Sequence, residues 1–398
     1  MTYDVSLKEG FAVNGAILIH NARLVIPDQP AKRGWLLCVD GKIDRIGYGD
    51  APAFENIRQI DGHNRLLLPG FVDIHVHGGT GHEAMDAQPD TLPELSRFYA
   101  HHGVTSFLAT TWTETRERIQ TALDYIAESK DTPLPGARML GAHLEGPYLN
   151  ADKAGAQNPD YVRPAAKDEA TAFLDTGVIR LLSLAPEITE NQWLISECVR
   201  RGITVSAAHT SATYDEMKYA VDLGLKNTTH TYNAMTGLHH RDPGTLGAAL
   251  AFDELRCELI ADNIHVHPGA MKVLYRAKGL DRVILITDAV RPAGLPDGDY
   301  PIDNRIISVK NGAARLPDGT LAGSILTMER ALRNFAAAVG EPVEKIWQVS
   351  SLNAAKSIGA AAHVGSIEVG KDADLVLVDE QVNVFATIVQ GNPVYHLD

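Results

Sequence analysis

The stretch Leu66–Gly79, LLLPGFVDIHVHGG, constrains the fold of this chain more than any other. A leucine run reaches a Pro-Gly turn, and a short apolar segment over 71–74 then leads to His75 and His77. Successive side chains of a strand point to opposite faces, so the two imidazoles project to the same side. Two such imidazoles at a strand end make half of a metal site. A His-x-His pair also occurs in ordinary turns, so the remaining ligands must come from elsewhere in the chain.

Composition places the chain among globular proteins and excludes several kinds of partner. With 398 residues, 45% hydrophobic and 22% charged, we expect one large domain and one small one. A formal net charge of -14 argues against nucleic acid as the main partner, although a local basic pocket for a small anion stays open. No run of about 18 apolar residues is present, so we predict no membrane association.

The cysteines and the N-terminus bear on the compartment. Cys38, Cys198 and Cys257 are odd in number and far apart, which indicates neither a disulfide framework nor a cysteine zinc cluster. The first ten residues, MTYDVSLKEG, are polar and lack the apolar core of a secretory signal. We therefore expect a cytoplasmic protein.

Both ends of the chain are rich in β-prone residues. Short β-type runs, a hairpin turn at Asp40–Gly41 and a second tight turn at 370–372 predict strands over 16–19, 24–26, 35–39, 42–46, 365–369, 373–378, 387–389 and 394–395. Two β-rich ends that flank a different middle suggest one small β-sandwich domain built from both termini. We expect the small domain to comprise 1–66 and 360–398, and the large domain 67–359.

The middle of the chain alternates between strand and helix patterns. Strands are predicted over 71–74, 105–108, 139–144, 180–184, 203–207, 227–229, 256–260 and 283–286, with helices over 91–103, 114–129, 167–175, 191–201, 214–223 and 268–278. This order favours an α/β fold of the (β/α)₈ TIM-like barrel type over a doubly wound sheet, and no Gly-x-Gly-x-x-Gly follows the first strand. Residues 289–323 predict a long loop or hairpin of the kind that forms lids, before a helix over 326–339.

Candidate metal-binding and catalytic residues follow five of the predicted barrel strands. The carboxyl ends of barrel strands form the active face, so side chains there share one rim. Taken singly, each has an ordinary explanation as a buried core histidine or a capping carboxylate. Together on one rim they form a candidate site that consists of His75, His77, Glu145, His209, His230 and Asp288.

The chemistry of this set indicates a metal-dependent hydrolase. Neutral imidazoles and carboxylates suit Zn²⁺ or another divalent first-row metal with a position left for water. Such a metal activates water and polarises a carbonyl. Asp288, which is not needed to complete the ligand count, suits a general base that later protonates a leaving amine. We predict hydrolysis of an amide or a related C–N bond.

These residues occur within motifs that resemble the amidohydrolase superfamily, and most closely its N-acetylglucosamine-6-phosphate deacetylase family. The resemblance runs through PGFVDIHVHGG, AHLEGPYLN, AAHTSA, THTYNAM, RDPG, ADNIHVH, LITDA, LAGS and GKDADLVLVD. It implies a barrel with a small β-sandwich from both termini, usually in a homodimer. It also implies hydrolysis of N-acetyl-D-glucosamine 6-phosphate to D-glucosamine 6-phosphate and acetate, in amino-sugar catabolism.

The resemblance also implies roles for the metal-site residues. Glu145, His209 and His230 match the principal metal site, and Asp288 matches the catalytic aspartate. Some family members lack the His75–His77 pair and bind one metal, whereas those that retain it bind a second and share the glutamate. We therefore expect two sites with one or two ions per chain, with zinc as the first expectation and iron, cobalt or manganese as alternatives.

Further positions match the family's contacts to the sugar phosphate. Arg241 is the expected main phosphate anchor, because an arginine fork matches phosphate geometry. In the family the histidine at position 265 reaches across from the neighbouring subunit. The full set of matched substrate positions is Ala156, Gln157, Asn233, Ala234, Arg241, His265, Leu321, Ala322 and Gly323.

One departure from the family pattern leaves the substrate open. The family usually shows Gly-x-His-Asn-Pro after HLEGP, and this chain has Gln157 at the histidine position. A glutamine donates a hydrogen bond but carries no proton or charge, so the sugar epimer and the acyl group stay undetermined. His143 either supports the metal ligands or is merely packed.

Three other functions compete with this one. The first is deacetylation of another N-acyl amino-sugar phosphate such as the galacto epimer, which Gln157 keeps open. The second is a cyclic amidase or a deaminase; it ranks lower because cyclic amidases commonly bridge their metals with a modified lysine, the role that Glu145 takes here. A non-catalytic scaffold ranks last, since no ligand is lost.

Overall fold

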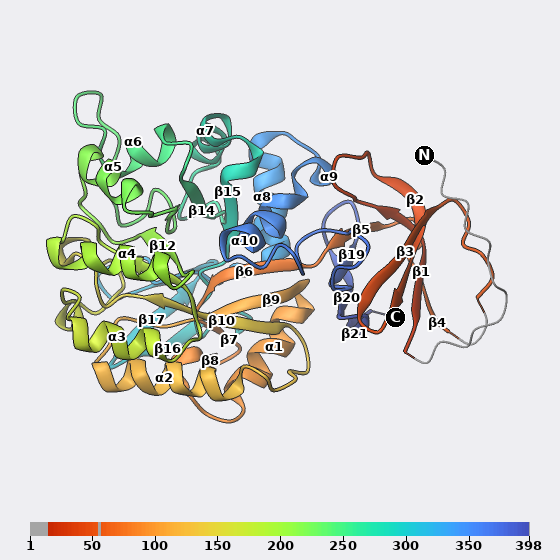
Figure 1. The fold of residues 1–398 in the computed structure, drawn as a ribbon, viewed down its shortest axis with the longest axis horizontal. Helices are drawn as coiled ribbons and strands as arrows, with labels where there is room; N and C mark the ends of the chain where they lie inside the picture. The colour runs from red at the N-terminus through yellow and green to blue at the C-terminus, as the bar shows by residue number, and fades with distance from the viewer. Residues whose placement is uncertain (1–14, 55–56, 398) are drawn as a thin grey trace.

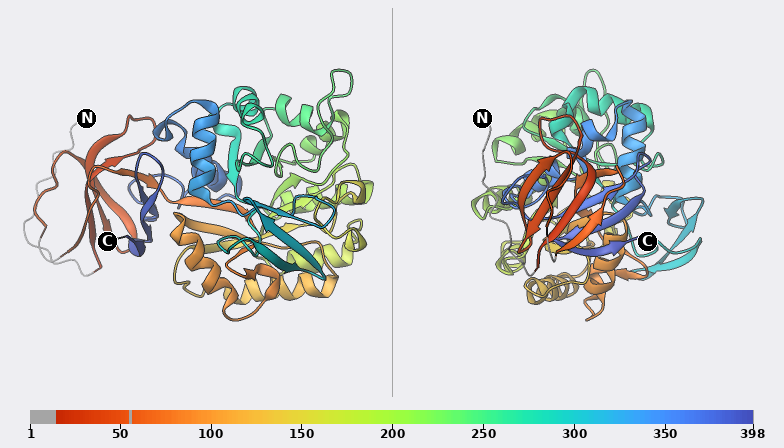
Figure 2. Two further views of the ribbon diagram at one scale, coloured as in Figure 1. Left: turned by 180° about the vertical axis from the view of Figure 1, so that it is seen from behind. Right: turned by 90° about the vertical axis from the view of Figure 1, so that its right-hand side faces the viewer.

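The computed structural model describes residues 15–54 and 57–397, which form a barrel and a smaller sheet domain. Residues 1–14, 55–56 and 398, which belong to the predicted segments 1–66 and 360–398, lie outside the described residues. Figures 1 and 2 show the small sheet at one end of the long axis, with the first and last parts of the chain side by side in it.

Eight parallel strands form the barrel, as the sequence predicts. In spatial order they are β6 (Phe71–Val76), β9 (Val104–Thr110), β10 (Arg138–Glu145), β11 (Ile179–Leu184), β12 (Thr204–Ala207), β13 (Asn227–Thr228), β14 (Arg256–Ile260) and β15 (Val283–Ile286). The seam between the first and last strands is bridged just beyond β15. Asp288 N donates to His75 O and His77 N donates to Ala289 O, both at 2.9 Å. Two residues of the candidate site thus sit at the seam.

Helices cover the outside of the barrel. They are α1 (Thr91–His101), α2 (Arg116–Ser129), α3 (Lys167–Asp175), α4 (Gln192–Arg200), α5 (Tyr214–Asp222), α6 (Gly244–Ala251), α7 (Pro268–Lys278), α8 (Met328–Val339), α9 (Val343–Ile346) and α10 (Leu352–Ser357). In α2 the buried residues Ile119, Leu123 and Ile126 recur at helical spacing, which is why this pattern was predictable. The sequence did not predict α6, because the residues of GTLGAALA are small and mostly apolar on all sides and show no helical period.

Short elements complete the barrel domain. The 3₁₀ turns are η1 (Ala84–Asp86), η2 (Ala151–Lys153), η3 (Pro159–Tyr161), η4 (Thr189–Asn191), η5 (Leu280–Arg282) and η6 (Trp347–Ser350), and β7 (Gly78–Gly79) pairs with β8 (His82–Glu83). Within the described ranges, the helices are all too short or too polar to cross a bilayer.

The small domain joins strands from both ends of the chain. It contains β1 (Ile17–Leu24), β2 (Lys32–Val39), β3 (Lys42–Tyr48), β4 (Arg58–Asp61), β5 (Leu66–Pro69), β19 (Leu375–Val378), β20 (Val384–Val389) and β21 (Asn392–His396). The two ends meet where β5 pairs antiparallel with β19. The predicted boundary between 66 and 67 falls at the start of β5, which leads directly into β6 of the barrel.

Two strand predictions at the ends of the chain need correction. The expected strands over 16–19 and 24–26 are one strand, β1, with a register shift between Ile19 and Ala22. The expected strand over 365–369 is wrong, because this segment forms turns. Gly365 has a φ of 93°, which is incompatible with an extended strand. It also packs closely on Leu352 and Ala355.

Buried charges fasten the small domain to the barrel. Arg138, at the start of β10, contacts Asp372 at 2.9 Å and also pairs with Asp374. The hydroxyl of Thr387 donates to the carbonyl of Ala100 at 2.7 Å. The small domain is therefore held against the amino ends of barrel strands, away from the rim that carries the candidate ligands.

The segment 289–323 is more ordered than the predicted loop or hairpin. It contains a three-stranded antiparallel sheet of β16 (Gly298–Ile302), β17 (Arg305–Lys310) and β18 (Ala313–Arg315), which Figure 2 shows projecting from the side of the barrel. Alternate residues such as Ile307 and Val309 are buried. Arg305 Nη2 donates to Ala156 O at 2.7 Å, so this sheet is tied to the loop after β10.

Candidate active site

The carboxylate of Glu145 lies between two pairs of imidazoles at the carboxyl rim of the barrel. Its Oε2 is 3.1 Å from Nε2 of His77 and 3.5 Å from Nε2 of His75. Its Oε1 is 3.3 Å from Nε2 of His209 and 3.2 Å from Nε2 of His230. One carboxylate therefore presents one oxygen to each pair, as a bridging ligand would.

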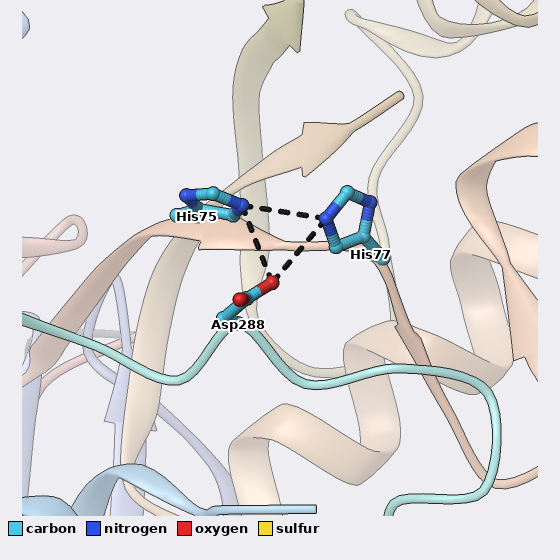
Figure 3. Close-up of side chains that lie close together, drawn as sticks. All are labelled: His75, His77 and Asp288. Atoms are coloured by element: carbon cyan, nitrogen blue, oxygen red, sulfur yellow. Dashed lines mark hydrogen bonds and ion pairs between the residues drawn. The ribbon is translucent and has the colours of Figure 1, made fainter. Parts of the chain in front are cut away.

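Asp288 completes the group on the β6 side. Its Oδ1 is 3.3 Å from Nε2 of both His75 and His77, and Figure 3 shows the three side chains converging. The residues thus fall into two triads that could each hold a metal ion: His75, His77 and Asp288, and Glu145, His209 and His230. The structure brings together all six residues that the sequence analysis singled out, and all six are buried. It also makes Asp288 a possible ligand as well as a possible base.

The backbone turns sharply where it delivers these side chains. Each of His209, His230 and Asp288 lies two residues beyond the end of its strand and has a positive φ, of 43°, 31° and 50°. Positive φ is unfavourable for residues other than glycine, and such strain concentrates at functional sites. Here the turn directs each side chain into the mouth of the barrel. The side chains therefore do not follow the alternation between the two faces that the strand would impose.

The charges in this cluster stabilise one another. Burial alone would raise the pKa of Glu145, but His75, His209 and His230 hold it well below its ordinary value. Burial likewise opposes ionisation of Asp288, yet His75 and His77 lower its pKa. Burial would lower the pKa of His75, but Glu145 and Asp288 raise it well above 6.5. Within the described residues the ion pairs of both carboxylates are to imidazoles alone, so a cation is the natural neutralising group.

The donor set fits a divalent metal ion. Nδ1 of His209 lies 2.8 Å from Lys153 O, and a proton on Nδ1 leaves the Nε2 lone pair free for an ion. The other three Nδ1 atoms are buried without hydrogen-bond partners. Imidazole nitrogens and carboxylate oxygens are ligands that zinc and other first-row divalent ions accept.

Gln157, the departure from the family pattern, holds the central carboxylate. Its Nε2 donates to Glu145 Oε2 at 2.7 Å, and its Oε1 accepts from Thr113 N at 2.8 Å. The backbone donor fixes which end of the amide faces Glu145, because an N–H must meet an oxygen. Gln157 therefore belongs to the site, in a role that the sequence did not predict.

Two aromatic side chains support the β6 histidines. Trp112, which the sequence analysis missed, stacks on His77 with a ring distance of 4.0 Å and an interplanar angle of 18°. The ring of His143 meets His75 edge-on at 4.5 Å, and its Nε2 lies 2.8 Å from Ser183 Oγ. Burial lowers the pKa of His143 well below its ordinary value, so the ring is neutral. His143 thus packs behind a candidate ligand and is not one itself.

A cavity of about 340 Å³ opens beside the two triads. It is large enough for a small ligand. The predicted substrate positions on its wall are Ala156, Gln157, Asn233, Ala234, His265, Leu321 and Gly323. Ala322 is fully buried and does not line it. Asp152, Lys153 and Thr320 also line the cavity and were not predicted, because the η2 turn and the segment after β18 carry no recognisable motif.

The two predicted phosphate contacts are placed differently. His265 lines the cavity of its own chain, and its Nδ1 lies 2.7 Å from Asp262 Oδ2. Its expected reach from a neighbouring subunit stays a prediction. Arg241 is exposed on the turn after 236, where its guanidinium contacts His240 Nε2 at 2.8 Å, and it does not line the cavity. The role predicted for Arg241 is therefore not visible in a single chain.

Comparisons with known proteins agree with this arrangement. The Amidohydrolase family profile matches residues 66–394. N-acetylglucosamine-6-phosphate deacetylase of Bacillus subtilis (strain 168) is 39% identical over 383 residues, which cover 95% of this chain and 96% of that protein. N-acetylgalactosamine-6-phosphate deacetylase of Escherichia coli O157:H7 is 37% identical over 364 residues, covering 90% and 96%. The crystal structure of N-acetylglucosamine-6-phosphate deacetylase from Pasteurella multocida superposes with a TM-score of 0.90 at 31% identity, covering 95% of this chain and 99% of that one.

Proposed function

Because the chain belongs to the amidohydrolase family and, within it, to the N-acetylglucosamine-6-phosphate deacetylases, we propose that it hydrolyses the acetamide of N-acetyl-D-glucosamine 6-phosphate. The products are D-glucosamine 6-phosphate and acetate. The observation that carries this proposal is the Glu145 carboxylate, set between two imidazole pairs at the mouth of the cavity.

The chain would hold one or two divalent ions at this rim. Glu145, His209 and His230 would hold one, and His75, His77 and Asp288 would hold a second with Glu145 shared. When bound, such an ion lowers the pKa of water toward about 7 and polarises a carbonyl. Zinc is the first candidate for a nitrogen and oxygen donor set, and iron, cobalt and manganese accept the same ligands.

Asp288 is the residue placed to move the proton. It lies at the edge of the cavity, and the imidazoles of His75 and His77 keep its carboxylate ionised at neutral pH. It would take a proton from the attacking water and return that proton to the amine nitrogen as the C–N bond breaks. Gln157 orients Glu145 through its hydrogen bond of 2.7 Å and cannot itself carry a proton.

Other residues that line the cavity would hold the sugar phosphate. They include His265, which is fixed by Asp262, and also Asn233 and Ala234. Arg241 would reach a phosphate only if its exposed turn moved, or if the turn of a second copy of the chain came to the cavity. A homodimer is therefore part of the proposal. A cytoplasmic location is also part of the proposal, and it is supported by three cysteines that are buried and form no disulfide.

A second candidate substrate is N-acetyl-D-galactosamine 6-phosphate. The observation that favours it is Gln157, which differs from the usual family histidine and lines the cavity beside Glu145. The similarity to the E. coli N-acetylgalactosamine-6-phosphate deacetylase is in keeping with this alternative. The two sugars differ only in the orientation of one hydroxyl group, so the chemistry at the metal rim would be the same.

Acetate release from a panel of N-acetylhexosamines, each with and without a 6-phosphate, tests the proposal on metal-loaded enzyme. The gluco 6-phosphate should give the highest kcat/KM, with the unphosphorylated sugars far poorer. The Asp288→Asn variant is the matched control, because it keeps the size of the side chain and removes the base. Preference for the galacto 6-phosphate selects the second candidate, and failure to release acetate from any of the phosphorylated sugars would refute the proposal.

A further inference from the structure

Glu258 is a fully buried carboxylate inside the barrel that no step of the proposed chemistry uses. It projects from β14 toward the barrel axis, one layer below the cavity-lining residue Ile260. Its Oε1 accepts a hydrogen bond of 2.9 Å from Asn227 Nδ2, which also donates to Ser357 Oγ at 2.8 Å. Its Oε2 is buried and has no hydrogen-bond partner. A buried carboxylate with one oxygen unsatisfied is costly and calls for a partner.

The unsatisfied oxygen faces an equally unsatisfied nitrogen of a candidate metal ligand. Nδ1 of His75 lies 3.8 Å from Glu258 Oε2, and this nitrogen is also buried without a hydrogen-bond partner. Both side chains are 0% exposed, so bulk solvent does not reach either atom. The separation of 3.8 Å exceeds a hydrogen-bond length, so the two atoms must come closer for a hydrogen bond to form.

We propose that Glu258 is a positioning residue, which holds the His75 imidazole by accepting a hydrogen bond from its Nδ1. This inference rests on the proposed function, in which the triad of His75, His77 and Asp288 binds a metal ion. A proton fixed on Nδ1 leaves the Nε2 lone pair directed at the rim, where Glu145 and Asp288 lie within 3.5 and 3.3 Å. Glu258 thereby acts on metal binding without touching the metal or the substrate.

The pairing is specific to one of the two triads. Nδ1 of His209, in the other triad, already lies 2.8 Å from Lys153 O. Nδ1 of His77 and Nδ1 of His230 lack hydrogen-bond partners, and among the described ion pairs neither approaches a carboxylate through that nitrogen. Removal of the Glu258 carboxylate should therefore weaken one metal site and spare the other.

Metal binding by Glu258→Gln tests the inference. The amide keeps the size of the side chain, but it cannot present oxygen both to Asn227 Nδ2 and to His75 Nδ1 in the observed arrangement. Chelator-treated protein is titrated with zinc, and bound ions per chain are measured at fixed free zinc. We expect one ion to bind as in the wild type and the other to bind about 10–100-fold more weakly. Ser96→Ala is the matched control, because it removes a buried hydroxyl that bonds only the backbone of Gly136 and Ala137 and contacts no candidate ligand.

A double-mutant cycle separates positioning from general destabilisation. In a His75→Asn background, Glu258→Gln should cause no further loss of zinc, since its effect passes through His75. Wild-type affinity at both sites of Glu258→Gln overturns the inference, and so does an equal loss at both sites or the same loss in Ser96→Ala. If the wild-type protein binds only one ion under zinc supplementation, the second site does not exist and the inference fails. Acetate release by that protein would still support the deacetylase proposal.

Discussion

The side-chain amide of Gln157 donates to Glu145 Oε2, the same oxygen that faces His75 and His77. The neighbouring Thr113 N fixes the direction of the amide from its other end. Gln157, where the family pattern predicts a histidine, therefore lines the cavity beside the carboxylate that faces both imidazole pairs.

Replacement of Gln157 by alanine should lower kcat/KM for the phosphorylated substrate by about 10–100-fold. The reason is the loss of a hydrogen bond to a charged group, which contributes roughly 1.5–3 kcal/mol. Steady-state acetate release measures the effect. Gln157→Glu is the informative comparison, because it keeps the length of the side chain but replaces the donor with a like charge beside Glu145. An alanine variant with wild-type kcat/KM would show that the hydrogen bond has no role.

Metal content should reach two ions per chain in protein purified without chelator and supplemented with zinc. A His75→Asn variant removes a ligand of only one triad, so it should keep one ion. Elemental analysis after removal of free zinc gives both ratios. A wild-type ratio that stays at one ion per chain would contradict the second site.

Arg241→Ala should raise KM for the phosphorylated sugar much more than for its unphosphorylated analogue. The guanidinium is exposed and its recorded contact is with His240, so the substitution should leave the stability of the chain nearly unchanged. Kinetics with both substrates provide the measurement, together with light scattering to establish the oligomeric state. Equal changes in KM for the two substrates would refute a phosphate role.

The sequence predicted the rim of the barrel well, because each of its six residues lies in or within two residues of the end of an apolar strand. It could not reveal Glu258 or Trp112, whose roles depend on contacts with a strand that is distant in the chain. Nor could it place Arg241, because the length of a turn does not fix where its tip points. The helix α6 and the third strand of the β16–β18 sheet were missed for want of a clear period.

Arg138→Ala should destabilise the protein by about 3–5 kcal/mol, because it leaves the buried Asp374 carboxylate without its cation. Chemical denaturation of metal-free protein measures the free energy of unfolding. The matched control is Arg116→Ala, whose partner Asp168 is exposed, and this variant should lose no more than about 1 kcal/mol. Similar losses in the two variants would mean that the contact between the domains contributes little.

The stabilisation that zinc confers should grow as the pH rises from about 6 to about 8. Burial would lower the pKa of His75 and His77, but Asp288 and Glu145 raise both above 6.5 in the metal-free protein. A raised pKa adds stability below the unfolded value of 6.5, and this stability is lost as the pH rises through the folded pKa. Zinc must displace those protons, so it competes better at higher pH. The lowered pKa values of Glu145 and Asp288 add stability that is lost as the pH falls. This loss occurs only near and below pH 4.5, outside the range of about 6 to 8.

The measurement is the difference in Tm between zinc-loaded and chelated protein at each pH. A variant with both His75→Asn and His77→Asn lacks the protons in question, so its difference in Tm should change less with pH. If the difference in Tm of the wild-type protein were the same at about pH 6 and about pH 8, zinc would not displace protons from His75 and His77. The two imidazoles would then be neutral before the metal binds, and the ion pairs at 3.1–3.5 Å around Glu145 and Asp288 would be ordinary hydrogen bonds or close contacts without charge on the rings.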